Sequence, residues 1–187
     1  MKTLLLSSLL LFTAISALAQ GQLIFINNAP QTITNAVTGV PAAGGPAQDD
    51  TQVGLYVGNV GDSVGSLQLI GAVTNCFTSG RFNGGTRTLS GWTGTVLLQV
   101  RAWLASTVYP SYEAAVAGAL AGDFSVLVGC SAPFNFALTE FPAGPNSIAG
   151  AGLTSIVLGA PCPVPEPSGI ALGLVALVAL ALFRSKK

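Results

Sequence analysis

The sequence predicts an all-β fold: an antiparallel β-sandwich of Ig-like or jelly-roll-like type with one short helix. An N-terminal signal peptide and a C-terminal transmembrane helix flank it. Short apolar runs follow one another between Gly, Asn, Pro and Ser, and they do not alternate with helices. No repeat of fixed length occurs, which argues against a solenoid. Both ends of the chain carry uncharged apolar segments, so the domain is expected between them, over residues 20–160.

The first part of the domain is predicted to consist of strands and polar loops. Val53, Leu55 and Val57 alternate with less apolar residues, which is the period of a half-buried strand. Residues 38–48 are rich in Gly, Pro and Ala and predict a loop. A turn over 59–66 predicts a hairpin between the two strands around it. Strands are predicted at 23–27, 32–35, 53–57 and 67–74.

The middle of the domain gives the clearest pattern. Gly84-Gly85 predicts a turn between two strands, and residues 95–103 predict a central strand. One face of that strand is apolar (Val96, Leu98, Val100, Ala102) and the other is mixed (Leu97, Gln99, Arg101, Trp103). A helix is predicted over 111–120, with Ser111 as N-cap, Glu113 in the first turn and Gly122 after its end. The last strands are predicted at 124–128, 134–138 and 153–158.

The N-terminal segment, residues 1–19, has the pattern of a secretory signal peptide. Lys2 gives a short positive region, residues 4–18 are almost all apolar, and Ala17 and Ala19 form a small-x-small site before Gln20. Signal peptidase cleavage is therefore expected at Gln20. A retained N-terminal anchor is the alternative.

The C-terminal segment, residues 161–187, has three parts. Pro165-Glu166-Pro167 disfavours helical angles and holds the chain extended. Residues 168–183 carry no charge and would span about 24 Å as a helix, slightly less than a bilayer core of about 30 Å. The chain then ends in a basic cluster expected to stay cytoplasmic, Arg184, Lys186 and Lys187. The alternative for the Pro-Glu-Pro triplet is a Pro-rich spacer. The alternative for residues 168–183 is a buried core helix.

These three parts in this order closely resemble the PEP-CTERM sorting signal of bacterial exported proteins. The resemblance implies processing by an exosortase, a membrane-embedded cysteine transpeptidase-like enzyme. Residues 79–129 are in addition similar to exported PEP-CTERM proteins of Verrucomicrobia-like bacteria, through Gly84-Gly85, the run LQVRAW at 98–103 and SYE at 111–113. This second resemblance implies a recurring extracellular domain and carries no activity with it.

Charge and composition exclude several classes of function. Residues 20–160 contain three arginines, six acids, no Lys and no His, a formal charge of −3. No basic patch is present to neutralise phosphates, so no nucleic-acid partner is expected. Without His, the domain has no Ser-His-Asp set and no imidazole ligand. The mean hydropathy of +0.65 is raised by the two terminal segments.

Three cysteines occur, and an oxidising exterior favours a disulfide. Cys76 and Cys130 both lie inside the domain, and a bridge between them would close a loop of about 55 residues. Cys162 lies beside the sorting segment. It pairs with Cys130 instead, stays a thiol, or serves as a handle for lipidation or processing. Three unlinked cysteines are the remaining alternative, and the absence of C-x-x-C argues against structural zinc.

Aromatic and acidic residues are the candidates for a ligand site. Aromatic side chains suit apolar sugar faces, and the candidate glycan platform consists of Trp92, Trp103, Tyr109 and Tyr112. Asp49, Asp50 and Asp62 lie in loops but lack the spacing of a calcium loop, so no metal site is predicted. Glu113, Asp123 and Glu140 show no spacing that pairs them, and no catalytic residue is predicted.

The sequence therefore predicts an exported, non-enzymatic protein without a cofactor. Its expected partners are the Sec export machinery, signal peptidase, an exosortase-type enzyme and extracellular polysaccharide. The tail is expected to anchor it transiently in the inner membrane, before delivery to the cell surface or an exopolysaccharide-rich extracellular matrix. A carbohydrate-binding surface module is the alternative, and a hydrolase of unrecognised type is the third.

Overall fold

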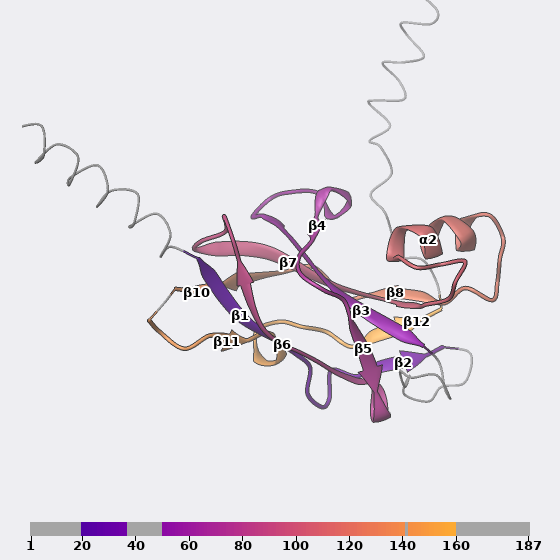
Figure 1. Ribbon diagram of the computed structural model, residues 1–187, viewed down its shortest axis with the longest axis horizontal. Helices are drawn as coiled ribbons and strands as arrows, with labels where there is room; N and C mark the ends of the chain where they lie inside the picture. The colour runs from indigo at the N-terminus through magenta and orange to yellow at the C-terminus, as the bar shows by residue number, and fades with distance from the viewer. Residues whose placement is uncertain (1–19, 37–49, 141, 160–187) are drawn as a thin grey trace, which may run out of the picture.

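The computed structural model describes residues 20–36, 50–140 and 142–159. These residues are mostly β, with one ten-stranded sheet, one two-stranded sheet and one α-helix (Figure 1). The pairings are antiparallel except for two short parallel ones. The predicted all-β class with one short helix is confirmed. The predicted signal peptide, the sorting segment and the loop at 38–48 lie outside the described residues.

The helix and strands have the following bounds: β1 Gly21–Ile26, β2 Ile33–Asn35, β3 Thr51–Asn59, β4 Gln68–Leu69, β5 Thr74–Phe77, β6 Arg81–Leu89, β7 Thr95–Leu104, α2 Tyr112–Leu120, β8 Val128–Cys130, β9 Phe134–Ala137, β10 Thr139–Glu140, β11 Asn146–Ser147 and β12 Ile156–Leu158. The large sheet has the order β10-β1-β6-β5-β3-β7-β8, and β9 also pairs β7. The strands β4 and β11 pair with β3 and β1, and β12 pairs with β2 in the small sheet.

The large sheet curls back on itself through residues 134–140. The strand β9 pairs with β7, and after the single residue Leu138 the chain continues as β10, which pairs with β1 at the other end of the strand order. This segment therefore bridges β7 and β1. The curled sheet encloses the larger core, which contains Leu23, Leu55 and Leu98.

The central strand β7 separates two cores, as its sequence predicts. Val96, Leu98, Val100 and Ala102 all lie in the larger core. On the other face Leu97 and Trp103 pack in a second, smaller core. Its neighbour β3 is buried on both faces rather than one, because Tyr56 also packs in the second core.

The helix α2 covers the second core, at the end of the sheet away from β10 (Figure 1). The Ser111 side chain accepts a hydrogen bond of 3.2 Å from the Ala114 amide, and Glu113 lies in the first turn. Ser111 thus satisfies one of the helix's unpaired N-terminal amides. Tyr112 and Ala115 form its buried face. The predicted helix and its N-cap are confirmed.

Gly84-Gly85 does not form the predicted turn. The strand β6 runs through both glycines, and its register with β1 shifts by one residue between Ile24 and Ile26. Gly85 has φ of +68°, so the pair forms a β-bulge, in which one extra residue takes a left-handed conformation. The sharp turn lies earlier, over Thr78–Gly80, between β5 and β6.

Two strand predictions were partly wrong. In the range 124–128 only Val128 is in a strand, and Phe124 is 93% exposed, because the chain turns back after α2 before reaching β7. In the range 67–74 only Gln68, Leu69 and Thr74 are in strands: the first two form β4 and Thr74 begins β5, and both strands pair with β3.

The predicted bridge between Cys76 and Cys130 is not formed. Cys76 lies on β5 and Cys130 on β8, three strand positions apart in the order β5-β3-β7-β8. At about 4.8 Å per strand this is about 14 Å, whereas a disulfide joins Cα atoms no more than about 7 Å apart. Cys76 is a buried thiol, while Cys130 is disulfide-bonded. Cys162 lies outside the described residues.

No helix in the described ranges has the length and apolar character needed to cross a membrane. The predicted membrane helix at 168–183 falls outside those ranges.

Candidate functional site

The four aromatic residues predicted as a glycan platform do not form one exposed surface. Trp103 is 1% and Tyr112 6% exposed, and both pack in the second core with their rings edge to face at 6.2 Å. Tyr109 packs against the rim of that core, whereas Trp92 packs against the larger core. The platform prediction is corrected for this reason: a sugar ring stacks on an exposed aromatic face, and these faces contact protein.

Arg101 lies at the centre of the second core's polar side. Its guanidinium carbon is 4.0 Å from the centre of the Tyr56 ring and 5.2 Å from that of Tyr112. Its Nε donates to Gln99 Oε1 at 2.8 Å, and an Nη donates to the Val64 carbonyl at 2.6 Å. Arg101 is 8% exposed, so these contacts take the place of water around its charge.

Glu113 links this arrangement to α2. Its carboxylate accepts a 2.9 Å hydrogen bond from the Tyr56 hydroxyl and lies 3.8 Å from Arg101. Burial and the hydrogen bond to Glu113 raise the pKa of Tyr56 well above its ordinary value. Since the Glu113 side chain is 62% exposed, its ion pair contributes little. The cluster fastens the helix to the sheet and is not arranged around a ligand.

The acidic residues have separate structural roles. Asp123 accepts hydrogen bonds from the Ser125 hydroxyl at 2.6 Å and from the Tyr109 hydroxyl at 2.7 Å, which lower its pKa. Asp62 accepts from the Asn59 amide at 2.7 Å and closes the turn after β3. Asp50 and Glu140 are exposed. Within the described residues no group of three or more acidic or sulfur ligands is placed to hold a metal, and Asp49 lies outside them.

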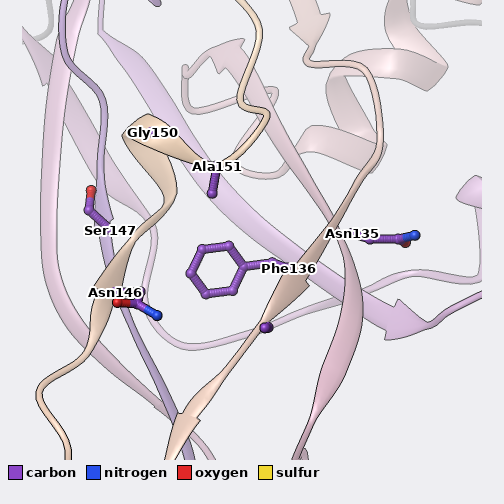
Figure 2. Close-up of a pocket in the computed structure, with 7 residues that line it drawn as sticks. Asn135, Phe136, Asn146, Ser147, Gly150 and Ala151 are labelled. Atoms are coloured by element: carbon purple, nitrogen blue, oxygen red, sulfur yellow. The ribbon is translucent and has the colours of Figure 1, made fainter.

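A cleft of about 340 Å³ opens between β9 and β11, the place where the curled sheet is incompletely paired. We refer to it as the seam cleft. Figure 2 shows the Phe136 ring between the two strands, with the Asn135 side chain directed away from the ring. The cleft is lined by Asn135, Phe136 and Ala137 on one side and by Asn146, Ser147, Gly150 and Ala151 on the other.

The seam exists because β1 changes partner along one edge. Gly21 and Gln22 pair with β10, but the next residues, Leu23 and Ile24, pair with β11. The strand β9 stays on β7, so β9 and β11 lie on different neighbours and do not pair with each other. A short 3₁₀ turn at Ile148–Gly150 follows β11, and its Ile148 is buried in the larger core.

The cleft surface is neutral and polar over an apolar floor. Asn135 and Asn146 are exposed and Ser147 is half-buried, while Phe136 is 3% exposed and belongs to the larger core. None of the lining residues is charged. This surface suits an uncharged ligand that forms hydrogen bonds.

The sequence pattern does not predict the seam cleft. The alternation of Phe134 and Phe136 with Asn135 and Ala137 was available as a signal for β9. Nothing in the sequence, however, indicates that the short segment Asn146–Ser147 replaces β10 beside β1.

No protein-family model matches the chain, and comparison with curated proteins and with solved structures found no significant similarity.

Proposed function

We propose that this chain is an exported, non-enzymatic protein of the cell surface or exopolysaccharide matrix, sorted by a PEP-CTERM-type tail. The observation that carries the proposal is the order of three signals at the C-terminus: Pro165-Glu166-Pro167, the uncharged residues 168–183, and the basic end. Each part alone is common. Together they describe a membrane segment that follows an extended peptide and precedes a positively charged end on the cytoplasmic side.

The start of the domain supports export with removal of a leader. The first strand begins at Gly21, one residue after the proposed cleavage point before Gln20. Gly21 is paired on both edges, with Leu89 and with Glu140. A Cβ at this position would meet Leu138 and the Trp92 carbonyl. The chain is therefore fixed tightly just after the proposed cleavage point.

A non-enzymatic role is supported by the chemistry of the described residues. The chain contains no His, and Asp123 and Glu113 are hydrogen-bonded to tyrosines. The seam cleft contains amide and hydroxyl groups but no charged or nucleophile–base pair of the kind that catalysis uses.

We further propose that the domain is a β-sandwich of Ig-like or jelly-roll-like type. The segment formed by β9 and β10, which pairs with both β7 and β1, would then join the two layers at one edge. The larger core supports this reading, because it contains residues of β1 and β6 on one side and of β3 and β7 on the other.

The sorting proposal is tested by changing Pro165, Glu166 and Pro167 together to Ala in the native host. We expect the variant to stay in the inner membrane with its tail intact, as measured by fractionation and intact mass. The matched control changes Pro161 and Pro163, two prolines just before the triplet, and is expected to be processed normally. Normal processing of the triple variant would refute the proposal.

A further inference from the structure

The outer edge of β9 presents unpaired main-chain groups to the seam cleft. In the β7–β9 ladder the Leu138 amide donates to the Gly94 carbonyl at 2.8 Å, so Leu138 and Gly94 form a hydrogen-bonded pair. Because such pairs alternate in an antiparallel ladder, Phe136 also bonds to β7, whereas Asn135 and Ala137 do not. The N–H and C=O groups of Asn135 and Ala137 therefore point away from β7, towards the cleft.

No other described residue takes these groups. The pairings of β9 are with β7 alone, and no turn or side-chain hydrogen bond among the described residues involves the amides or carbonyls of Asn135 and Ala137. Both residues are exposed and line the cleft. They are two residues apart, about 6.8 Å, which is the repeat at which an added strand forms its hydrogen bonds.

The opposite wall consists of small and neutral residues. Gly150 and Ala151 are small, and the exposed Asn146 side chain makes no hydrogen bond with another described residue. The main-chain N–H of Asn146 donates a hydrogen bond to Thr139 Oγ1 at 3.2 Å, so this group is not used to pair β11 with β9. The three arginines of the domain lie on β6 and β7 and do not line the cleft.

We infer that the seam cleft is a docking site for an extended, uncharged peptide strand, which adds to β9 through the main chain of Asn135 and Ala137. A polypeptide matches this edge because its own donors and acceptors recur with the same two-residue period. A glycan has no such period, so the register favours a peptide. The inference concerns the exported domain itself and does not depend on how the tail is sorted.

The first test uses residue-resolved amide hydrogen exchange on the full chain in detergent. In the free protein the Asn135 and Ala137 amides should exchange at least about tenfold faster than those of Phe136 and Leu138, which bond to β7. The probe is the blocked peptide acetyl-Thr-Val-Thr-Val-Thr-amide. Its addition should slow the Asn135 and Ala137 amides by about tenfold or more.

The controls separate strand addition from general binding. Two versions of the same peptide carry N-methyl groups on alternate residues, each version along a different hydrogen-bonding edge of the peptide strand. Only one of the two versions should lose this protection. Ala137→Pro removes the cleft-facing donor without removing a bond to β7, and should weaken probe binding about tenfold, while Ala137→Ser should not. Protection by both methylated versions, or by none of the peptides, would overturn the inference. Protection by the neutral glycan cellopentaose but not by the peptide would overturn it in favour of a glycan site. If Ala137→Pro does not fold, the methylated peptides decide the matter on the unmodified chain.

Discussion

Replacing Arg101 by Met tests whether its cluster holds α2 to the sheet. The change removes the hydrogen bonds to Gln99 and to the Val64 carbonyl and the cation–π contact with Tyr56. Two charge-assisted bonds contribute about 1.5 kcal/mol each and the cation–π contact about 1–2 kcal/mol. Avoided desolvation of the buried charge offsets part of this sum. We expect the free energy of unfolding to fall by about 3 kcal/mol.

Arg87→Met is the matched control. Arg87 also lies near an aromatic ring, with its guanidinium carbon 5.5 Å from the centre of Phe25, but its buried Nε has no hydrogen-bond partner among the described residues. We expect this change to cost less than about 1 kcal/mol.

Both variants are measured by urea unfolding of the full chain in detergent and by thermal unfolding. The expected loss for Arg101→Met corresponds to a fall in Tm of roughly 10–15 °C for a domain of this size. Equal losses for the two arginines, or a loss below about 1 kcal/mol for Arg101→Met, would show that the Arg101 cluster does not hold α2 to the sheet.

Two further predictions concern a glycine pair and the buried thiol. Gly80 and Gly85 have nearly equal positive φ, +70° and +68°, but a Cβ on Gly80 would overlap the Ile33 main chain, whereas one on Gly85 would meet nothing within 4 Å. Gly85→Ala should therefore cost about 1 kcal/mol and Gly80→Ala at least about 2 kcal/mol more, by urea unfolding; equal costs would contradict this. Burial raises the pKa of Cys76 from 9.0 to about 12. At pH 8 iodoacetamide should thus modify it about a thousandfold more slowly in the folded than in the unfolded chain, followed by mass spectrometry. Because the folded pKa is the higher one, the associated stability is complete below pH 9 and is lost as the pH rises towards 12. Cleavage after Glu113 and Glu140 separates Cys76 from Cys130, and a non-reduced digest that links these two would contradict their strand positions.

The sequence predicts best those elements whose side chains alternate between two different environments, one on each face. The alternation along 95–103 identified both faces of β7 because one faces the large core and the other faces α2. The helix was predicted with its N-cap because Ser111 acts through a local bond to Ala114 that does not depend on the rest of the fold.

Other features depend on contacts between distant residues. The strands β10 and β11 are two residues long each, and they form only through main-chain pairing with the edge of β1. Gly84-Gly85 has the composition of a turn, but pairing with β1 extends it into a bulged strand. Trp103 was predicted on the correct face of β7, yet only the position of α2 shows that this face is buried rather than open to a ligand.

The pairing of β1 with residues near the other end of the domain has a consequence for the order of folding. In a chain that crosses a membrane N-terminus first, Gly21 and Leu23 emerge early, but their respective partners Glu140 and Asn146 emerge more than 100 residues later. The first strand therefore waits with an unpaired edge through most of translocation. The segment that completes the sheet ends at Ser147, only about 20 residues before Pro165. If the tail is sorted as proposed, completion of the large sheet would coincide with arrival of the tail at the membrane, and β12, which ends at Leu158, would follow directly.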